Sequence, residues 1–189
     1  MESKVSVYIA TSLDGYIAEK DGGIDWLHDP RYGVPDNLGL SYEDFISTVD
    51  VLVMGRKSYE KVLSFPTWSY PNTPVVVLSQ QSLSVPPELK DTVDTAAGEP
   101  REIIEALNKK GQYHIYLDGG LTIQRFLAAG LVNEITITQI PIVLGDGIPL
   151  FSPQTNSIHL VHLDTSTSSN GFVQNRYKLI NPLVQTPAS

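Results

Sequence analysis

The sequence predicts an α/β domain with a mostly parallel central sheet and an antiparallel edge. Strand patterns alternate with helical patterns along most of the chain, as is typical of parallel sheets. Residues 74–79 (PVVVLS) form a continuous apolar run of the kind found inside such sheets. The last two strand patterns, at residues 159–165 and 172–179, are joined through Ser169, Asn170 and Gly171, which favour a hairpin.

The first half of the chain alternates strands with one long loop and two helices. Residues 4–12 are rich in valine, isoleucine and tyrosine and predict a central strand. Residues 19–40 contain glycines and prolines but no regular pattern, and a loop of this length in a compact domain is usually functional. Trp26 within it predicts a flap that packs either over a ligand or over the sheet edge. Ser41 is a suitable N-cap, because acidic residues occupy the first turn of the helical pattern that follows.

The remaining elements follow from apolar runs and from the residues at their ends. Residues 50–54 predict a buried strand that turns at Gly55 into a helix ending near residues 65–66, and residues 92–94 predict a short strand. Pro100 and Gly111 suit the first residue and the end of another helix. Residues 134–140 alternate as a half-buried strand.

Gly119 and Gly120 stand between a short apolar run at residues 114–117 and a helical pattern that ends near Gly130. A glycine pair at this point lets the phosphates of a ligand approach the free N–H groups of the first helical turn. Gly55 occupies an equivalent place after an earlier strand. Since the carboxyl ends of parallel strands carry the ligand sites of such sheets, the two turns can bind one elongated anion. The alternative is that the glycines form only tight turns.

Composition restricts the class of protein. At 189 residues the chain is long enough for a full core, and we expect one domain at residues 1–180 with a tail at 181–189. Hydrophobic residues make up 41% and charged residues 18%, a globular balance. The absence of cysteine excludes disulfides and thiolate chemistry. No run approaches the roughly 20 apolar residues that span a bilayer, so we expect no membrane partner and a cytoplasmic protein.

Charge and motifs exclude several functions. The net charge of −8 argues against nucleic-acid binding. Within this acidic chain there is one basic cluster, formed by Arg56, Lys57 and Lys61, which predicts either an anion site or a solvated helix face. The sequence contains no Rossmann fingerprint, no P-loop and no G-x-S-x-G motif. The histidines are scattered, and we expect no metal site.

Four segments resemble, in order, the dihydrofolate reductase-like fold. They are residues 9–18 (IATSLDGYIA), 53–60 (VMGRKSYE), 118–120 (DGG) and 140–151 (IPIVLGDGIPLF). The resemblance is closer to the reductase domain of riboflavin biosynthesis, the RibD C-terminal type, and to its stand-alone bacterial relatives. It covers residues 5–179 and implies a three-layer α/β/α fold, NADPH as cofactor and hydride transfer to a small polar, pyrimidine- or pterin-like substrate.

The resemblance also implies a set of cofactor contacts. Ala10 and Ile17 would border the nicotinamide, and Arg56 would contact the 2′-phosphate, for which a guanidinium is well suited. The other phosphate, adenosine and pyrophosphate positions would be Gly55, Lys57, Ser58, Ser79, Gln80, Gly119, Gly120, Leu121 and Thr122. Lys57 could equally be a solvated charge.

The substrate side is less defined. Position 31, where dihydrofolate reductases carry an acid, is Arg31, so Asp29 is the nearest candidate for a proton donor or orienter, unless it is simply solvated. Thr73 stands where an arginine would hold the folate tail, which disfavours dihydrofolate. Trp26 and Thr138 are substrate candidates, Thr138 being otherwise an ordinary strand residue. The alternatives are a non-catalytic nucleotide-binding protein of the same fold and a true dihydrofolate reductase. Exposed strands near the C-terminus lead us to expect a homodimer.

Overall fold

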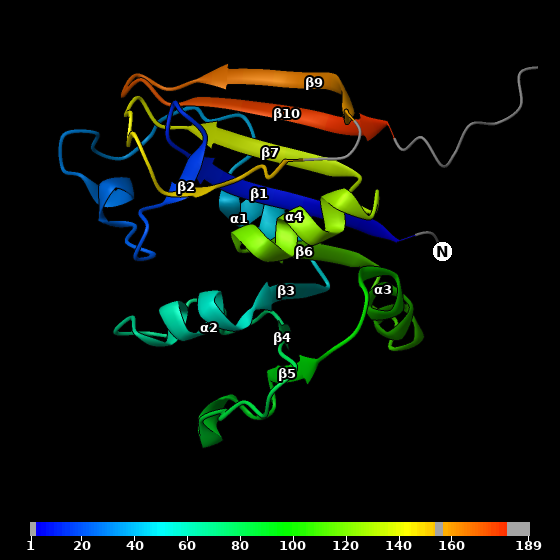
Figure 1. The fold of residues 1–189 in the computed structure, drawn as a ribbon. Coiled ribbons are helices and arrows are strands. Elements are labelled where there is room, and N and C mark those ends of the chain that lie inside the picture. The colour runs from blue at the N-terminus through cyan, green and yellow to red at the C-terminus, as the bar shows by residue number, and fades with distance from the viewer. Residues whose placement is uncertain (1–2, 154–156, 181–189) are drawn as a thin grey trace, which may run out of the picture.

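The computed structural model describes residues 3–153 and 157–180, and its main sheet has eight strands in the order β5-β4-β3-β6-β1-β7-β10-β9 (Figure 1). The tail expected at residues 181–189 lies outside the described residues. The strands are β1 (Lys4–Thr11), β3 (Val51–Gly55), β4 (Val75–Leu78), β5 (Val93–Ala96), β6 (His114–Asp118), β7 (Glu134–Gln139), β9 (His159–Thr167) and β10 (Val173–Ile180).

The direction of the strands confirms the predicted sheet. Strands β5, β4, β3, β6, β1 and β7 are all parallel to one another, whereas β10 is antiparallel to both β7 and β9. The turn between β9 and β10 follows the predicted hairpin signal, because Gly171 has φ +87° and its N–H donates to the carbonyl of Ser168 at 3.0 Å. A second, two-stranded sheet pairs β2 (Tyr16–Ala18) with β8 (Ile148–Pro149).

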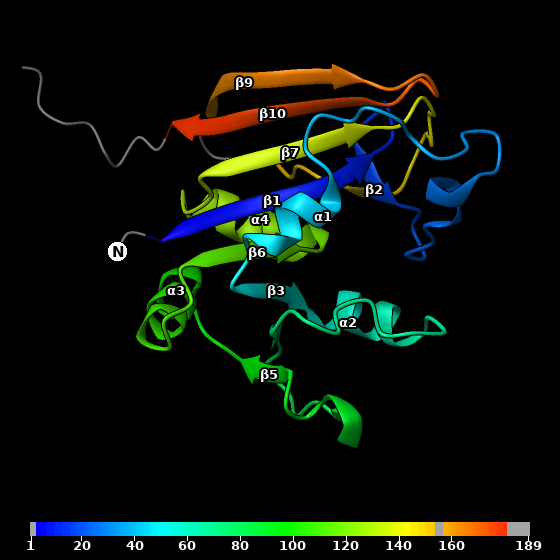
Figure 2. The ribbon, with the colours of Figure 1, turned by 180° about the vertical axis from the view of Figure 1, so that it is seen from behind.

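Helices cover both faces of the main sheet, as the predicted three-layer arrangement requires. Helices α3 (Pro100–Lys109) and α4 (Gly120–Ala128) share one core with the sheet, to which Ile103, Phe126 and Val53 belong. Helices α1 (Tyr42–Ser47) and α2 (Arg56–Leu63) share the opposite core, with Phe45 and Tyr59. Accordingly, α4 lies before the sheet in Figure 1 and α1 lies before it in Figure 2.

The predicted helix ends agree with the structure to within a few residues. The Ser41 hydroxyl accepts the N–H of Asp44 at 3.0 Å, which confirms the N-cap of α1. Helix α3 begins at Pro100 and is followed by Gly111, which has φ +81°. Helix α2 ends at Leu63, two residues earlier than expected. No helix among the described residues is long and apolar enough to cross a membrane.

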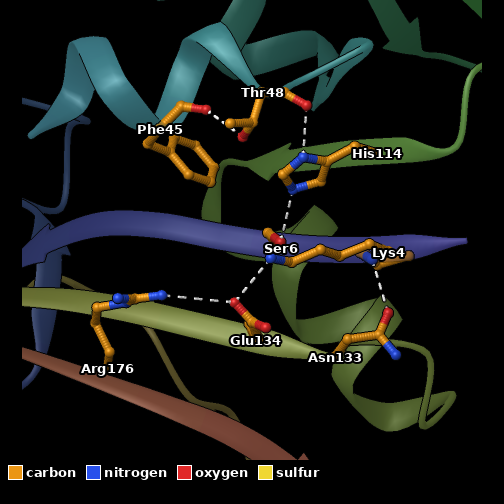
Figure 3. Close-up of polar contacts among 9 residues, drawn as sticks. Lys4, Ser6, Phe45, Thr48, His114, Asn133, Glu134 and Arg176 are labelled. Atoms are coloured by element: carbon orange, nitrogen blue, oxygen red, sulfur yellow. Dashed lines mark hydrogen bonds and ion pairs between the residues drawn. The ribbon is translucent and has the colours of Figure 1, made fainter. Parts of the chain in front are cut away.

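His114 ties the amino end of β6 to its neighbours, at the end of the sheet remote from the glycine turns (Figure 3). Its Nδ1 donates to the carbonyl of Thr48 at 2.7 Å, and its Nε2 lies 3.0 Å from the hydroxyl of Ser6. Because a carbonyl only accepts, a neutral ring carries its proton on Nδ1 and accepts from Ser6 through Nε2. Burial lowers the pKa of His114, the nearby Lys4 lowers it further, and the Thr48 carbonyl, Asp50 and Glu134 oppose this shift.

Acidification is therefore expected to destabilise the fold through His114. The unfolded chain takes up this proton near pH 6.5 and the folded chain only at lower pH, so stability is full above pH 6.5. Below that pH it falls by at most about 1.4 kcal/mol per pH unit, until the folded pKa is reached. We expect the free energy of unfolding, measured with urea, to fall less between pH 7.5 and pH 5.5 in His114→Asn than in the unchanged protein. An identical loss in both would contradict this assignment.

Candidate functional site

The two glycine turns lie side by side, because β3 and β6 are adjacent parallel strands. Gly55, which precedes α2, lies against the first turn of α4. Gly119, which precedes α4, lies against the first turn of α2. A Cβ atom on Gly55 would lie 3.2 Å from the Thr122 hydroxyl in the first turn of α4. A Cβ on Gly119 would overlap the Ser58 hydroxyl in the first turn of α2. Only residues without a side chain allow the starts of both helices to approach this closely.

This arrangement directs two helix N-termini to the same end of the sheet. The first N–H groups of a helix have no partner within the helix, and the helix dipole adds positive potential there. Neither Gly55 nor Gly119 offers a capping side chain. The paired turns therefore have the chemistry of an anion site.

Gly120 is covered by the smaller sheet. A Cβ on Gly120 would lie 3.2 Å from Ile17 Cδ1 and 3.1 Å from Ile148 Cγ2, side chains that β2 and β8 contribute. Ala10, on the neighbouring β1, pairs in register with Thr138 of β7. The structure thus places Ile17 at the start of α4 and Ala10 on the adjacent strand, both half-buried, beside the paired turns.

Arg56 extends from α2 toward the loop after β4. Its Nε donates to Glu60 at 2.7 Å and its Nη1 to the Gln81 side chain at 3.1 Å. The Ser79 hydroxyl donates to the Gln81 carbonyl at 2.8 Å, which orders this loop. Sequence reasoning assigned Arg56 and Ser79 to one end of a dinucleotide, and the fold brings them together across two elements. Lys57, beside Arg56, is exposed.

A hollow of about 250 Å³ adjoins this loop. It contains two predicted residues, Ser79 and Gln80. Sequence reasoning missed its opposite wall, which includes Gly98 and Arg125, where the Arg125 guanidinium donates to the Gly98 carbonyl at 3.0 Å. Because that wall comes from the start of α3 and from the last turn of α4, no local motif in the sequence could have marked it.

The substrate candidates lie around the carboxyl ends of β1 and β7 and the amino end of β10. Thr138 is buried, and its hydroxyl accepts from the Gln174 amide at 3.3 Å. Trp26, in the loop before α1, is buried in one cluster with Ile140, which follows β7, and Phe172, which precedes β10. The Nε1 of Trp26 has no hydrogen-bond partner within the described chain.

The surroundings of Asp29 do not suit a proton donor, the role for which the sequence made it a candidate. Its carboxylate lies 2.6 Å from Arg31 Nη2 in a surface loop. The hydrogen bonds from the Arg31 side chain and backbone lower the pKa of Asp29 to about 2. At neutral pH it is ionised and bears no proton to donate, so its catalytic role stays a prediction that this environment disfavours.

A different acid lies beside the glycine turns. Asp118, the last residue of β6, is half-buried, and its Oδ1 accepts the Gly119 N–H at 2.8 Å. Burial raises the pKa of Asp118. Sequence reasoning treated this residue only as part of a turn, because an acid before two glycines has no pattern that reveals its burial. Within the described ranges, no group of three or more acidic or histidine side chains is placed to hold a metal ion.

Comparison with known proteins identifies the family. Residues 3–174 match the model of the RibD C-terminal domain. The uncharacterised protein YwjB of Bacillus subtilis is 39% identical over 163 residues, which cover 85% of this chain and 89% of YwjB. The crystal structure of a putative riboflavin biosynthesis protein from Shewanella sp. PV-4 is 39% identical, superposes with a TM-score of 0.83 and matches 94% of this chain and 99% of that one.

A more distant structure has the same fold. Dihydrofolate reductase from Enterococcus faecalis, solved in complex with NADP(H), has a TM-score of 0.61 at 16% identity, over 93% of this chain and 96% of its own. The predicted dihydrofolate reductase-like fold is confirmed by these superpositions. With a family model that matches nearly the whole described sequence, the chain belongs to the RibD C-terminal domain family.

Proposed function

We propose that this protein is an NADPH-dependent reductase that transfers a hydride to a small polar, heterocyclic substrate. The observation that carries the proposal is the reciprocal contact of the two glycine turns, which sets the N-termini of α2 and α4 at one end of the sheet. NADPH carries charged phosphates at its pyrophosphate and at the 2′-position of its adenosine, and the site offers one anion position at the turns and another at Arg56.

The residues present fit the cofactor from one end of the site to the other. Gly119, Gly120 and Thr122 would take the pyrophosphate through backbone and hydroxyl groups at the start of α4. Arg56 would bind the 2′-phosphate, and Ser79 and the adjoining hollow would take the adenosine. The cofactor supplies the hydride, and the protein contributes position and electrostatics. Apolar Ile17 would exclude water from the face of the nicotinamide.

Titration with NADPH tests the proposal directly. We expect saturable binding, seen as enhanced nicotinamide fluorescence, with a dissociation constant in the micromolar range that is typical of enzyme ligands. Binding that stays unsaturated at millimolar NADPH would overturn the proposal. Following NADPH oxidation with pyrimidine intermediates, dihydropterins and simple carbonyls then tests turnover, and binding without any oxidation would identify a non-catalytic nucleotide-binding protein.

We also propose that two copies of the chain pair through β9. This strand is at the end of the sheet, is nine residues long and contains no lysine, arginine or proline, the residues that normally protect an edge strand from pairing. Its Leu160, Val161 and Leu163 are 42–46% exposed. Antiparallel pairing about a two-fold axis at Leu163 would place Asp164 of each copy opposite His162 of the other, so the edge is complementary to itself.

The expected dimer can be measured by light scattering coupled to size exclusion. Replacing Val161 and Leu163 together with lysine should convert the dimer into a monomer, because two like-charged edges then meet. Val34→Lys is the control, since Val34 is 91% exposed in a loop and should leave the mass unchanged. A monomeric unchanged protein, or a double variant that stays dimeric, would show that β9 is not the interface.

A further inference from the structure

One buried glutamine joins the long loop at residues 19–40 to the sheet. Gln174, on β10, is 1% exposed. Its Oε1 accepts the N–H of Leu40, the last residue of the loop, at 2.9 Å, and its Nε2 donates to the Leu40 carbonyl at 3.0 Å. Because an N–H only donates and a carbonyl only accepts, these two bonds fix the orientation of the amide. Glutamine is seldom fully buried, so we attribute its place here to the groups that it bonds.

The same amide reaches two side chains of the neighbouring strands. Gln174 Nε2 lies 3.2 Å from the Tyr8 hydroxyl of β1 and 3.3 Å from the Thr138 hydroxyl of β7. An amide nitrogen carries two N–H groups, and the Leu40 carbonyl takes one of them. Tyr8 and Thr138 are therefore alternative acceptors for the other. Since the Tyr8 hydroxyl itself donates to the Leu40 carbonyl at 2.8 Å, one side chain joins the end of the loop to β1, β7 and β10.

Further hydrogen bonds attach the second half of the loop to the hairpin of β9 and β10. The Asp36 N–H donates to the Ser168 hydroxyl at 2.9 Å, and that hydroxyl donates to the Asp36 carboxylate at 2.8 Å. The Gly39 N–H donates to the Ser166 hydroxyl at 2.7 Å. Among these anchors Gln174 is the most deeply buried. It is also the one that bonds both backbone groups of a single loop residue, so we expect it to contribute most to holding the loop.

The anchored loop packs over the strand that borders the proposed nicotinamide position. Trp26 and Leu38, both in the loop, share one apolar cluster with Ala10 of β1. In the register of the sheet, Gln174 pairs with Thr138 and Thr138 pairs with Ala10. The residue that holds the loop and the residue that the loop covers therefore lie in one row across three neighbouring strands.

We propose that Gln174 is a positioning residue, which holds the loop at residues 19–40 against the sheet so that the cluster around Trp26 excludes water from the nicotinamide end of the site. This inference rests on the proposed reductase function and extends it to a residue that acts through Leu40. Hydride transfer is favoured in a site closed to water, and a loop that packs over the reacting groups provides such closure. Without the amide, the Leu40 N–H has no partner within the described chain, and the loop loses its buried anchor.

Hydrogen exchange of the full chain tests the anchor without any ligand. Gln174→Met fills a similar volume but cannot donate to Leu40. We expect the amide protons of residues 36–40 to exchange at least about tenfold faster than in the unchanged protein, while those of α3 keep their rates. Gln112→Met is the matched control, because the Gln112 Oε1 is buried without a partner within the described chain. Equal protection of residues 36–40 in Gln174→Met and in the unchanged protein would overturn the inference.

Gln174→Glu separates hydrogen bonding from packing. A protonated carboxyl can make both bonds to Leu40, whereas an ionised one only accepts and repels the Leu40 carbonyl. Tyr8, which faces the amide, stays neutral, because burial raises its pKa; the Gln174 hydrogen bond opposes this shift and Glu43 adds to it. After correction for intrinsic exchange, with α3 as reference, residues 36–40 should be at least about tenfold better protected at pH 5.5 than at pH 8.5. Protection as low as in Gln174→Met at both pH values would show that hydrogen bonding at this position does not hold the loop.

The fluorescence of bound NADPH connects the anchor to the proposed function. At saturation, Gln174→Met should lose at least about half of the nicotinamide fluorescence enhancement, because water then reaches the ring. Its dissociation constant for NADPH should change by less than about threefold, since the phosphate positions lie on α2 and α4 and not on this loop. Full enhancement in a variant whose residues 36–40 exchange freely would overturn the role of Gln174 alone. If NADPH does not bind even the unchanged protein, the reductase function fails and the positioning role fails with it.

Discussion

The variant Gly119→Ala should lose at least about 100-fold in NADPH affinity, the largest effect that we expect from a single added methyl group. Gly119 has φ +87°, a conformation that costs a residue with a side chain about 1–3 kcal/mol. In addition, its Cβ would overlap the Ser58 hydroxyl, so the starts of α2 and α4 must separate. Both anion positions are then displaced at once.

A matched control exists in the same chain. Gly111 has φ +81°, and a Cβ there would meet nothing within 4 Å. Gly111→Ala therefore carries a similar conformational cost, which thermal unfolding will report, but should leave NADPH affinity unchanged. The double variant Gly119→Ala with Ser58→Gly should recover part of the affinity by removing the overlapping hydroxyl. Normal NADPH binding by Gly119→Ala would mean that the cofactor does not use the paired turns.

Arg56→Ala should weaken NADPH by about 10- to 100-fold and NADH hardly at all. A charge-assisted hydrogen bond contributes about 1.5–3 kcal/mol, and only NADPH has the 2′-phosphate that would receive it. Glu60 and Gln81 already hold the guanidinium beside the Ser79 loop, so the side chain is ordered before any ligand arrives. Fluorescence titrations of both proteins with NADPH and with NADH measure the loss of affinity for each cofactor.

Lys57→Ala is the matched control for this measurement, because Lys57 is the next residue of α2 and carries the same charge. It is exposed, and its loss should reduce NADPH affinity by less than about threefold, as expected of a screened surface charge. If Arg56→Ala weakens NADPH and NADH equally, the 2′-phosphate assignment is wrong and Arg56 supports the site in another way.

Most elements of the fold were predictable because their signals are local. The apolar run at residues 74–79 became β4, the Ser41 side chain caps α1, and Gly171 adopts the positive φ of a hairpin turn. Each of these signals depends on residues within a few positions of one another. Boundaries were less certain, and α2 ends two residues before the expected position because the local pattern does not specify the last turn.

The candidate site was predictable only in its backbone parts. Gly55 and Gly119 were recognisable because each stands between a strand pattern and a helical pattern, although a tight turn alone would explain the same glycines. Asp118 escaped notice, since the sequence does not tell which face of a fully buried strand its last residue occupies. Asp29 was chosen by its distance from Trp26 along the chain, and the ion pair with Arg31 lies in side-chain geometry that spacing does not specify.

The sequence by itself determined the class of fold, the order of its elements and the two glycine turns, because propensity, capping and periodicity act over a few residues. Only the tertiary structure decided that the turns contact each other's helices and that Arg56 reaches the Ser79 loop. It also decided that Tyr42 and Tyr70, far from Asp118 in the chain, lie near enough for its carboxylate to add to the burial that raises the pKa of both. Such contacts join residues far apart in the chain, and they depend on the order in which strands pair, which no local pattern encodes.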